Sequence, residues 1–198
     1  MLKTDVLTLG DYQTNCYILR EAGEKTCCVV DPGYEPETIL SFLEEKGLTL
    51  GAILLTHGHF DHVMGVEGLM EFVDGPLYMS RLDLDKDIGN GSFLFSPPEN
   101  TVFVGHGDTV EVGKLRFEVI GCPGHTPGGL TYRIEDCLFT GDTLFRLSVG
   151  RSDFPASDEK ALRRSLARLA ALEGDYDVYP GHGRATTLEY ERHFNPYL

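Results

Sequence analysis

The stretch THGHFDH, from Thr56 to His62, places three histidines and one aspartate within six residues. It follows the apolar run Gly51 to Leu55, whose length and composition are typical of a buried strand. The chain has seven histidines in 198 residues, so the pattern HxHxDH arises by accident on the order of one time in a thousand. Imidazole and carboxylate are ligands that zinc, manganese and iron accept. The stretch therefore indicates a metal site.

The spacing within this stretch suggests two metal positions. In a tight turn after a strand, His57 and His59 can converge on one ion, while Asp61 and His62 turn toward a second point nearby. One cluster of four side chains cannot fill two coordination spheres. The remaining ligands are therefore expected elsewhere in the sequence.

Three further candidates each follow a strand-like run. They are His125 in GCPGHTPGG (121–129), Asp142 in LFTGDT (138–143) and His182 in VYPGHG (178–183). Glycine beside each candidate lets the backbone turn tightly and bring the side chain to a common rim. Taken singly, each is more simply explained as a hydrogen-bonded loop residue, but together they indicate a shared metal centre.

Composition and charge restrict the class of protein. A chain of 198 residues with 41% hydrophobic content and no linker-like segment is expected to form one domain over 1–198. Its net charge of −14 argues against nucleic acid as a partner. The five cysteines are odd in number and lack a CxxC spacing, so they are interpreted as buried thiols in a reducing compartment. With neither a signal-peptide pattern nor a membrane-length apolar segment, a soluble cytoplasmic protein that does not bind membranes is expected.

Residue patterns predict alternating strands and helices. Helices are expected over 36–46 and 158–172, the second with Arg163, Arg164 and Arg168 on a solvated face. Residues 81–100 show no sustained period and are interpreted as a loop with one helical turn. Strands are expected over 6–9, 15–20, 27–30, 51–55, 77–79, 101–104, 115–120, 130–134 and 137–140.

The motifs together resemble the metallo-β-lactamase fold superfamily and, within it, the short glyoxalase II-like hydrolases. The similarity rests on THGHFDH (56–62), PGHTPG (123–128), GDTLF (141–145), GRSDFP (150–155) and PGHG (180–183), in this order and spacing. It implies an α/β protein with a four-layer αββα sandwich, with the metals between the loop ends of two sheets. It also implies that the C-terminal helical glutathione-binding domain of longer glyoxalase II enzymes is missing here.

The resemblance also implies a ligand set and a cofactor. One metal would be held by His57, His59 and His125, the other by Asp61, His62 and His182, with Asp142 bridging them. Two zinc ions are the family expectation, and iron or manganese suit the same ligands. The sequence departs from relatives at Cys122 and His106, and neither is expected to bind metal.

A reaction follows from such a centre. Two divalent cations can share one water and lower its pKa from about 16 toward 7, which gives a hydroxide that attacks a carbonyl carbon. Asp61 and Asp142 are accordingly expected to serve catalysis as well as metal binding. A thiolate can leave without protonation, whereas an amide nitrogen cannot, so small-molecule thioesters such as S-lactoylglutathione are the favoured substrates.

The residues that would recognise the substrate are less well defined by the sequence. The resemblance makes Arg151 a candidate anchor for the glutathione carboxylate, although a structural ion pair with a nearby aspartate explains it equally well. Arg146 and Arg184 are weaker candidates for the same role.

Other functions stay open at this point. A persulfide dioxygenase of the same fold would use a single iron held by His57, His125 and Asp142. A lactonase or another ester hydrolase would use the full ligand set, whereas a β-lactamase of the main zinc class would need a cysteine in place of Asp142. A metal-stabilised binding or sensor module without turnover is the alternative outside enzymes.

Overall fold

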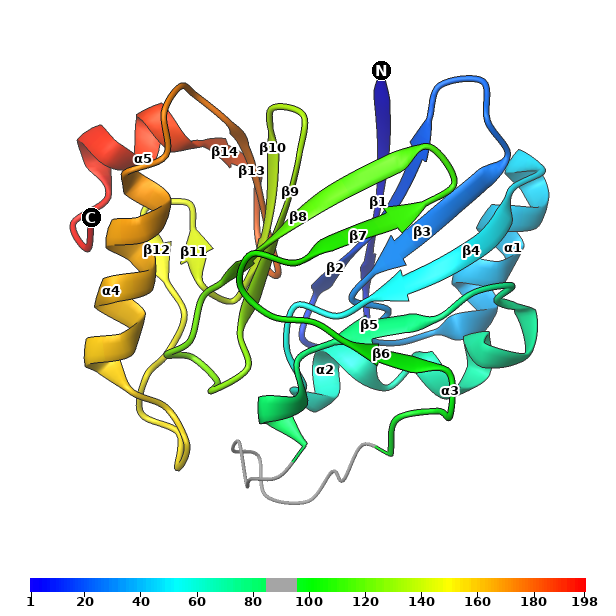
Figure 1. Ribbon diagram of the computed structural model, residues 1–198, viewed down its shortest axis with the longest axis horizontal. Coiled ribbons are helices and arrows are strands. Elements are labelled where there is room, and N and C mark those ends of the chain that lie inside the picture. The colour runs from blue at the N-terminus through cyan, green and yellow to red at the C-terminus, as the bar shows by residue number, and fades with distance from the viewer. Residues whose placement is uncertain (85–95) are drawn as a thin grey trace.

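Two six-stranded sheets form the centre of the protein (Figure 1). The computed structural model describes residues 1–84 and 96–198. The first sheet contains, in spatial order, β1 (Leu2–Leu9), β2 (Thr14–Glu21), β3 (Thr26–Val30), β4 (Thr49–Leu54), β5 (Leu77–Met79) and β6 (Thr101–Phe103). The second contains β14 (Thr186–Thr187), β13 (Asp177–Pro180), β10 (Cys137–Gly141), β9 (Leu130–Ile134), β8 (Leu115–Gly121) and β7 (Thr109–Val112). A small hairpin pairs β11 (Leu144–Phe145) with β12 (Ser148–Val149).

Helices cover the outer face of each sheet (Figure 1). The first sheet packs against α1 (Pro36–Lys46), α2 (Phe60–Val63) and α3 (Val66–Leu69), and α3 continues into the short 3-10 helix η1 (Met70–Phe72). The second sheet packs against α4 (Glu159–Ala170) and α5 (Leu188–Phe194). A second 3-10 helix, η2 (Arg81–Asp83), follows β5.

Three apolar clusters correspond to the three interfaces between four layers. One fills the space between the sheets, and the other two lie between each sheet and its helices. The alternation of strand side chains divides them: in β2, Tyr17 and Leu19 belong to the cluster between the sheets, while Cys16 and Ile18 face the helices. The αββα sandwich implied by the resemblance is therefore confirmed.

The two long helices have the ends and faces that their sequences predict. Pro36 occupies the first turn of α1, and Gly47 ends that helix with a left-handed φ of 61°. Asp158 caps the N-terminus of α4, where its carboxylate accepts a hydrogen bond from the amide of Ala161 (2.9 Å). The three arginines of the predicted solvated face are all exposed, and Arg168 also donates to the carbonyl of Gly121.

Short elements were the ones missed in the sequence. The residues after His59 form the one-turn helix α2 rather than a plain turn, and α3, α5, β7, β11, β12 and β14 were not predicted. Apart from α5, which has seven residues, these elements have two to four residues, too few positions to show a period. Within 81–100, η2 supplies the predicted helical turn, while residues 85–95 lie outside the described residues. In the described ranges, none of the helices combines the length and apolar character needed to span a bilayer.

The topology gathers five strand ends at one edge of the sandwich. Strands β3 and β4 run parallel on either side of the α1 crossover, and β10 runs parallel to β13. Asp31 follows β3, His57 follows β4, His125 follows β8, Asp142 follows β10 and His182 follows β13. Because ligands of α/β sheets bind outside the carboxyl ends of parallel strands, this edge is where a functional site is expected.

Candidate metal centre

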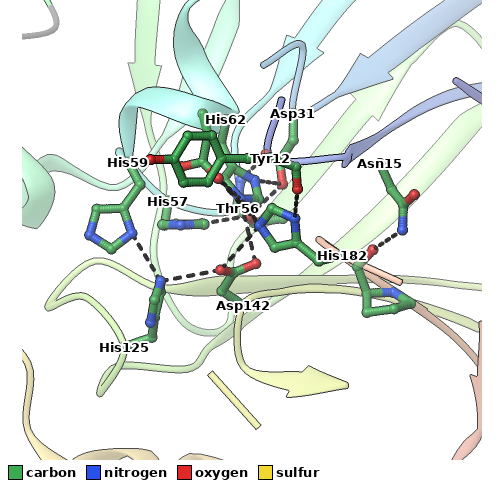
Figure 2. Close-up of polar contacts among 12 residues, drawn as sticks. Tyr12, Asn15, Asp31, Thr56, His57, His59, His62, His125, Asp142 and His182 are labelled. Atoms are coloured by element: carbon green, nitrogen blue, oxygen red, sulfur yellow. Dashed lines mark hydrogen bonds and ion pairs between the residues drawn. The ribbon is translucent and has the colours of Figure 1, made fainter. Parts of the chain in front are cut away.

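All seven side chains that the sequence singled out as ligands converge at this edge, and Figure 2 labels all of them except Asp61. The nitrogens of His57, His59 and His125 lie within 4.8 Å of one another, and so do the ligand atoms of Asp61, His62 and His182. The carboxylate of Asp142 lies between the two groups. Its Oδ2 is 3.4 Å from His125 Nε2 and 3.5 Å from His182 Nε2, and its Oδ1 is 3.4 Å from His62 Nε2.

Hydrogen bonds fix the ring orientation of the two histidines nearest Asp31. His57 Nδ1 lies 3.0 Å from the hydroxyl of Thr56, which donates to Asp31 Oδ2 (2.6 Å). His62 Nδ1 donates to the same carboxylate oxygen (2.9 Å). We assign both protons to Nδ1 from this network, since a carboxylate only accepts. The Nε2 atoms of both rings therefore face the centre as lone pairs.

Backbone carbonyls orient two further histidines in the same way. His125 Nδ1 donates to the carbonyl of Arg151 (2.8 Å), and His182 Nδ1 donates to the carbonyl of Tyr12 (3.0 Å). Outer partners of this kind set the tautomer of metal-binding histidines. Four imidazoles thus present Nε2 to the centre, while His59 presents Nδ1, 2.9 Å from His125 Nε2.

This arrangement fits bound divalent cations. The Nε2 atoms of His62 and His182 lie 3.3 Å apart, and two neutral rings with Nδ1–H cannot hydrogen-bond there without a positive charge between them. His57 Nε2 and Asp142 Oδ1 are buried without a hydrogen-bond partner among the described residues. Such orphaned lone pairs are costly in a protein interior unless something binds them. A cation in each group would satisfy them.

The electrostatics suit the same ligand set. Burial raises the pKa of Asp142, but the imidazoles of His62, His125 and His182 outweigh this effect and lower it. Burial, together with the neighbouring histidines, lowers the pKa of His57. Metal binding needs ionised carboxylates and neutral imidazoles, and these shifts favour both forms. The pKa of His62 is raised overall, because the carboxylates of Asp142 and Asp31 outweigh the opposing effect of burial. The position of the His62 ring therefore favours a positive charge.

Two buried aspartates in the site were missed in the sequence. Asp31 is grouped with His57 and His62 as a possible third metal position, but its oxygens already accept from the amide and hydroxyl of Thr56 and from His62 Nδ1. We therefore assign it an orienting role. Its position directly after a strand, like that of His57 after β4, was the signal that could have revealed it.

Asp83 connects the two histidine loops. Its carboxylate accepts from the amides of Gly58 (3.0 Å) and Gly128 (2.5 Å) and from the hydroxyl of Thr126 (2.9 Å). It thereby fixes the segment before His59 against the segment after His125. Asp83 lies in the stretch where the sequence shows no period, so no pattern indicated it.

The candidate substrate residues lie at the exposed edge. Arg151 pairs with Asp153 through two contacts of 2.9 Å, with both side chains 68% exposed, and its guanidinium lies over the ring of Phe154. Arg146 lies over the ring of Tyr190, and Arg184 is exposed two residues after His182. The ion pair considered for Arg151 is thus present, and its role as an anchor stays a prediction.

Neither departure from the family pattern lies in a candidate metal group. Cys122 is buried and accepts a hydrogen bond from Thr131, and His106 is exposed. Among the described residues, the groups able to hold a metal contain neither of them.

The glycine before His125 fits a narrow space against α4. A Cβ on Gly124 would lie 2.3 Å from the backbone N and Cα of Leu162, and its φ is +142°. Gly174 also has a positive φ, +87°, but nothing lies within 4 Å of its Cβ position. We expect Gly174→Ala to cost about 1 kcal/mol of stability and Gly124→Ala at least about 2 kcal/mol more, because backbone cannot move aside easily. Urea denaturation of both variants measures the difference. Equal losses would show that the contact is not limiting.

Two layered sheets with a histidine and aspartate centre at one edge define a class of protein. Residues 9–182 match the metallo-β-lactamase superfamily, and the chain belongs to it. A curated relative, the hydroxyacylglutathione hydrolase GloC of Haemophilus influenzae, is 32% identical, over 100% of this chain and 98% of GloC.

Solved structures extend the comparison. The BLEG-1 B3 metallo-β-lactamase matches with a TM-score of 0.88 and 32% identity, over 100% of this chain and 99% of its own. TTHA1623 in a di-iron-bound form matches with a TM-score of 0.86 and 39% identity, over 98% of this chain and 100% of its own. ETHE1 from Myxococcus xanthus matches with a TM-score of 0.84 and 31% identity, over 98% of this chain and 83% of its own. Together with the family match, the comparisons support a metal-dependent hydrolase of this superfamily.

Proposed function

We propose that the protein is a binuclear hydrolase that cleaves thioesters of the S-lactoylglutathione type. The observation behind this proposal is the position of Asp142, whose two oxygens lie 3.4 Å from His125 and from His62, one in each ligand group. A carboxylate placed in this way suits two ions better than one. Two ions are also what the TTHA1623 structure contains, in its case iron, whereas zinc is our proposal here.

The chain contributes orientation and charge to the reaction. When bound, two divalent cations acidify a shared water and polarise a carbonyl oxygen. Asp61 and Asp142 would supply negative charge to hold both ions. The hydrogen bonds from Nδ1 of His57 and His62 keep their Nε2 atoms aimed at the centre, so little reorganisation is needed during a reaction cycle.

Two phenyl rings near the centre are consistent with a leaving group that needs no proton. The ring of Phe154 lies against His59 and His125 at centroid distances of 5.2 and 5.6 Å, and Phe145 lies 6.1 Å from His182. Phenyl rings cannot protonate a departing atom. A thiolate, whose parent thiol has a pKa of about 8.5, leaves without such help. The name of the relative GloC supports the same substrate class.

The likeness to ETHE1 makes a mononuclear iron persulfide dioxygenase the second candidate. That reaction would need only His57, His125 and Asp142. It leaves Asp61, His62 and His182 without a role, although their ligand atoms also lie within 4.8 Å of one another. A lactonase or another ester hydrolase would use the full set. The likeness to BLEG-1 adds β-lactams to the substrates worth assaying.

The test is hydrolysis of S-lactoylglutathione by protein stripped of metal and reloaded with zinc, iron or manganese. We expect turnover to require metal and to reach at least about 10⁴ M⁻¹s⁻¹ with two ions bound per chain. Two bound ions without thioester cleavage, but with cleavage of a lactone or a β-lactam, would contradict the substrate. One iron with oxygen uptake on a persulfide would contradict the hydrolase.

Arg151 provides a prediction about substrate recognition. Its exposed ion pair with Asp153 contributes little to stability, so Arg151→Ala should leave the unfolding midpoint unchanged. If the guanidinium contacts the glutathione carboxylate, the KM for S-lactoylglutathione rises by about 5-fold with little change in kcat. Asp153→Ala is the matched control, because it removes the same pair but keeps the cation. A rise in KM in both variants would assign Arg151 a structural role only.

A further inference from the structure

The turn between β1 and β2, in the first sheet, contacts His182, which follows β13 of the second sheet. The carbonyl of Tyr12 accepts from His182 Nδ1 (3.0 Å), and Thr14 forms an isolated bridge with His182. The amide of Asn15 donates to the carbonyl of Gly181 (2.8 Å). Segments separated by about 165 positions in the chain therefore meet at one histidine. We refer to residues 180–183 as the His182 loop.

Asn15 adds side-chain contacts to both ends of this loop, and Figure 2 shows one of them. Its Nδ2 donates to the carbonyls of Pro180 (3.0 Å) and Gly183 (2.8 Å), on either side of His182. Its Oδ1 accepts from the hydroxyl of Thr8 (3.2 Å), which fixes the orientation of the amide. The side chain is buried, with 4% of the residue exposed.

These contacts can be lost without unfolding the strand that supplies them. The carbonyl of Pro180 also accepts from the hydroxyl of Tyr17 (2.6 Å), so it keeps a partner when Asn15 is replaced. Gly183 is exposed, and its carbonyl can turn toward water. Loss of the Asn15 contacts should therefore change mainly the geometry of the His182 loop, because the segment after His182 loses a hydrogen bond that holds it in place.

We propose that Asn15 is a positioning residue for the second metal ion, the one assigned to Asp61, His62 and His182. This inference rests on the proposed two-metal centre. His182 is the most exposed of the ligands, with 26% of its side chain accessible, and it lies 3.3 Å from Asp61 Oδ2. Its loop is held by β2, whereas His57, His59 and His125 lie in other loops. Asn15 therefore acts on one metal group and not on the other.

The test is a zinc titration of metal-free protein against a chelator of known affinity, for wild type and Asn15→Ala. Wild type should bind two ions. In the variant, one ion should bind within about 3-fold of wild type and the other 10- to 100-fold more weakly, the range for outer partners of metal ligands. Asn15→Ser, whose hydroxyl can restore one of the two donors, should lie between them and also serves if the alanine variant does not fold.

Asn195→Ala is the matched control. Asn195 is equally buried, at 5% exposed, and its Nδ2 donates to the carbonyl of Ser148 (3.0 Å) and to Glu191 (2.8 Å). It should lower stability but retain both zinc ions. If Asn15→Ala keeps both affinities, or weakens both equally, the inference is wrong while the two-metal centre stands. If wild type binds a single ion, the two-metal centre and the inference fail together.

Discussion

Asp142→Asn is expected to lower kcat/KM for S-lactoylglutathione on the order of 1,000-fold. Removing an outer partner of a metal ligand costs roughly 10- to 100-fold. Asp142 lies closer to the chemistry than such a partner, because its two oxygens face both ligand groups. The asparagine amide lacks the negative charge, and it has an NH₂ group in place of one oxygen. This group can donate to the Nε2 lone pair of a neighbouring imidazole, and that lone pair is then not available to a metal ion. We therefore expect a loss beyond the outer-partner range.

The same variant should also change metal content. We expect fewer than two ions per chain by elemental analysis, and a circular dichroism spectrum like that of wild type. Asp108→Asn is the matched control, because the Asp108 carboxylate accepts from the amide of Gly105 in an exposed turn, away from the candidate ligands. Full activity of Asp142→Asn with two ions bound would contradict the bridging assignment.

Much of the architecture could be predicted because long elements show their period. The ranges 36–46 and 130–134 match α1 and β9 residue for residue. The ligand residues could be found because histidine is rare, and each one follows a strand-like run next to glycine. The sequence therefore indicated which side chains gather. It did not indicate what holds them in place.

The supporting contacts could not be predicted because they join distant positions through common residue types. Asp31 precedes Pro32 and Gly33, residues typical of a turn, and only the pairing of β3 with β4 brings it to Thr56. Asn15 and the His182 loop meet only because the two sheets pack face to face. Backbone carbonyls, such as those of Tyr12 and Arg151, leave no trace in the sequence at all.

Asp31→Asn should lower the affinity for both metal ions, by about 10- to 100-fold each. Asp31 Oδ2 accepts from His62 Nδ1 and from the hydroxyl of Thr56, which orients His57, while Oδ1 accepts from the amide of Thr56. An asparagine has only one acceptor oxygen. If its nitrogen replaces Oδ2, this new donor faces the Nδ1–H of His62, and His62 must move its proton to Nε2, the atom that would bind metal. If its nitrogen replaces Oδ1, it opposes the amide of Thr56.

Two further variants separate this effect from general destabilisation. Thr56→Val removes only the hydroxyl that orients His57, so it should weaken the ion of the His57 group and spare the other. Asp158→Asn changes another structural carboxylate, the cap of α4, where asparagine serves equally well, and should keep both ions. Zinc titration of the three proteins tests the assignment. If Asp31→Asn weakens only one ion, Asp31 does not connect the two groups. If Asp31→Asn binds both ions as wild type does, the tautomers at the centre are set by the metals and not by the carboxylate behind them.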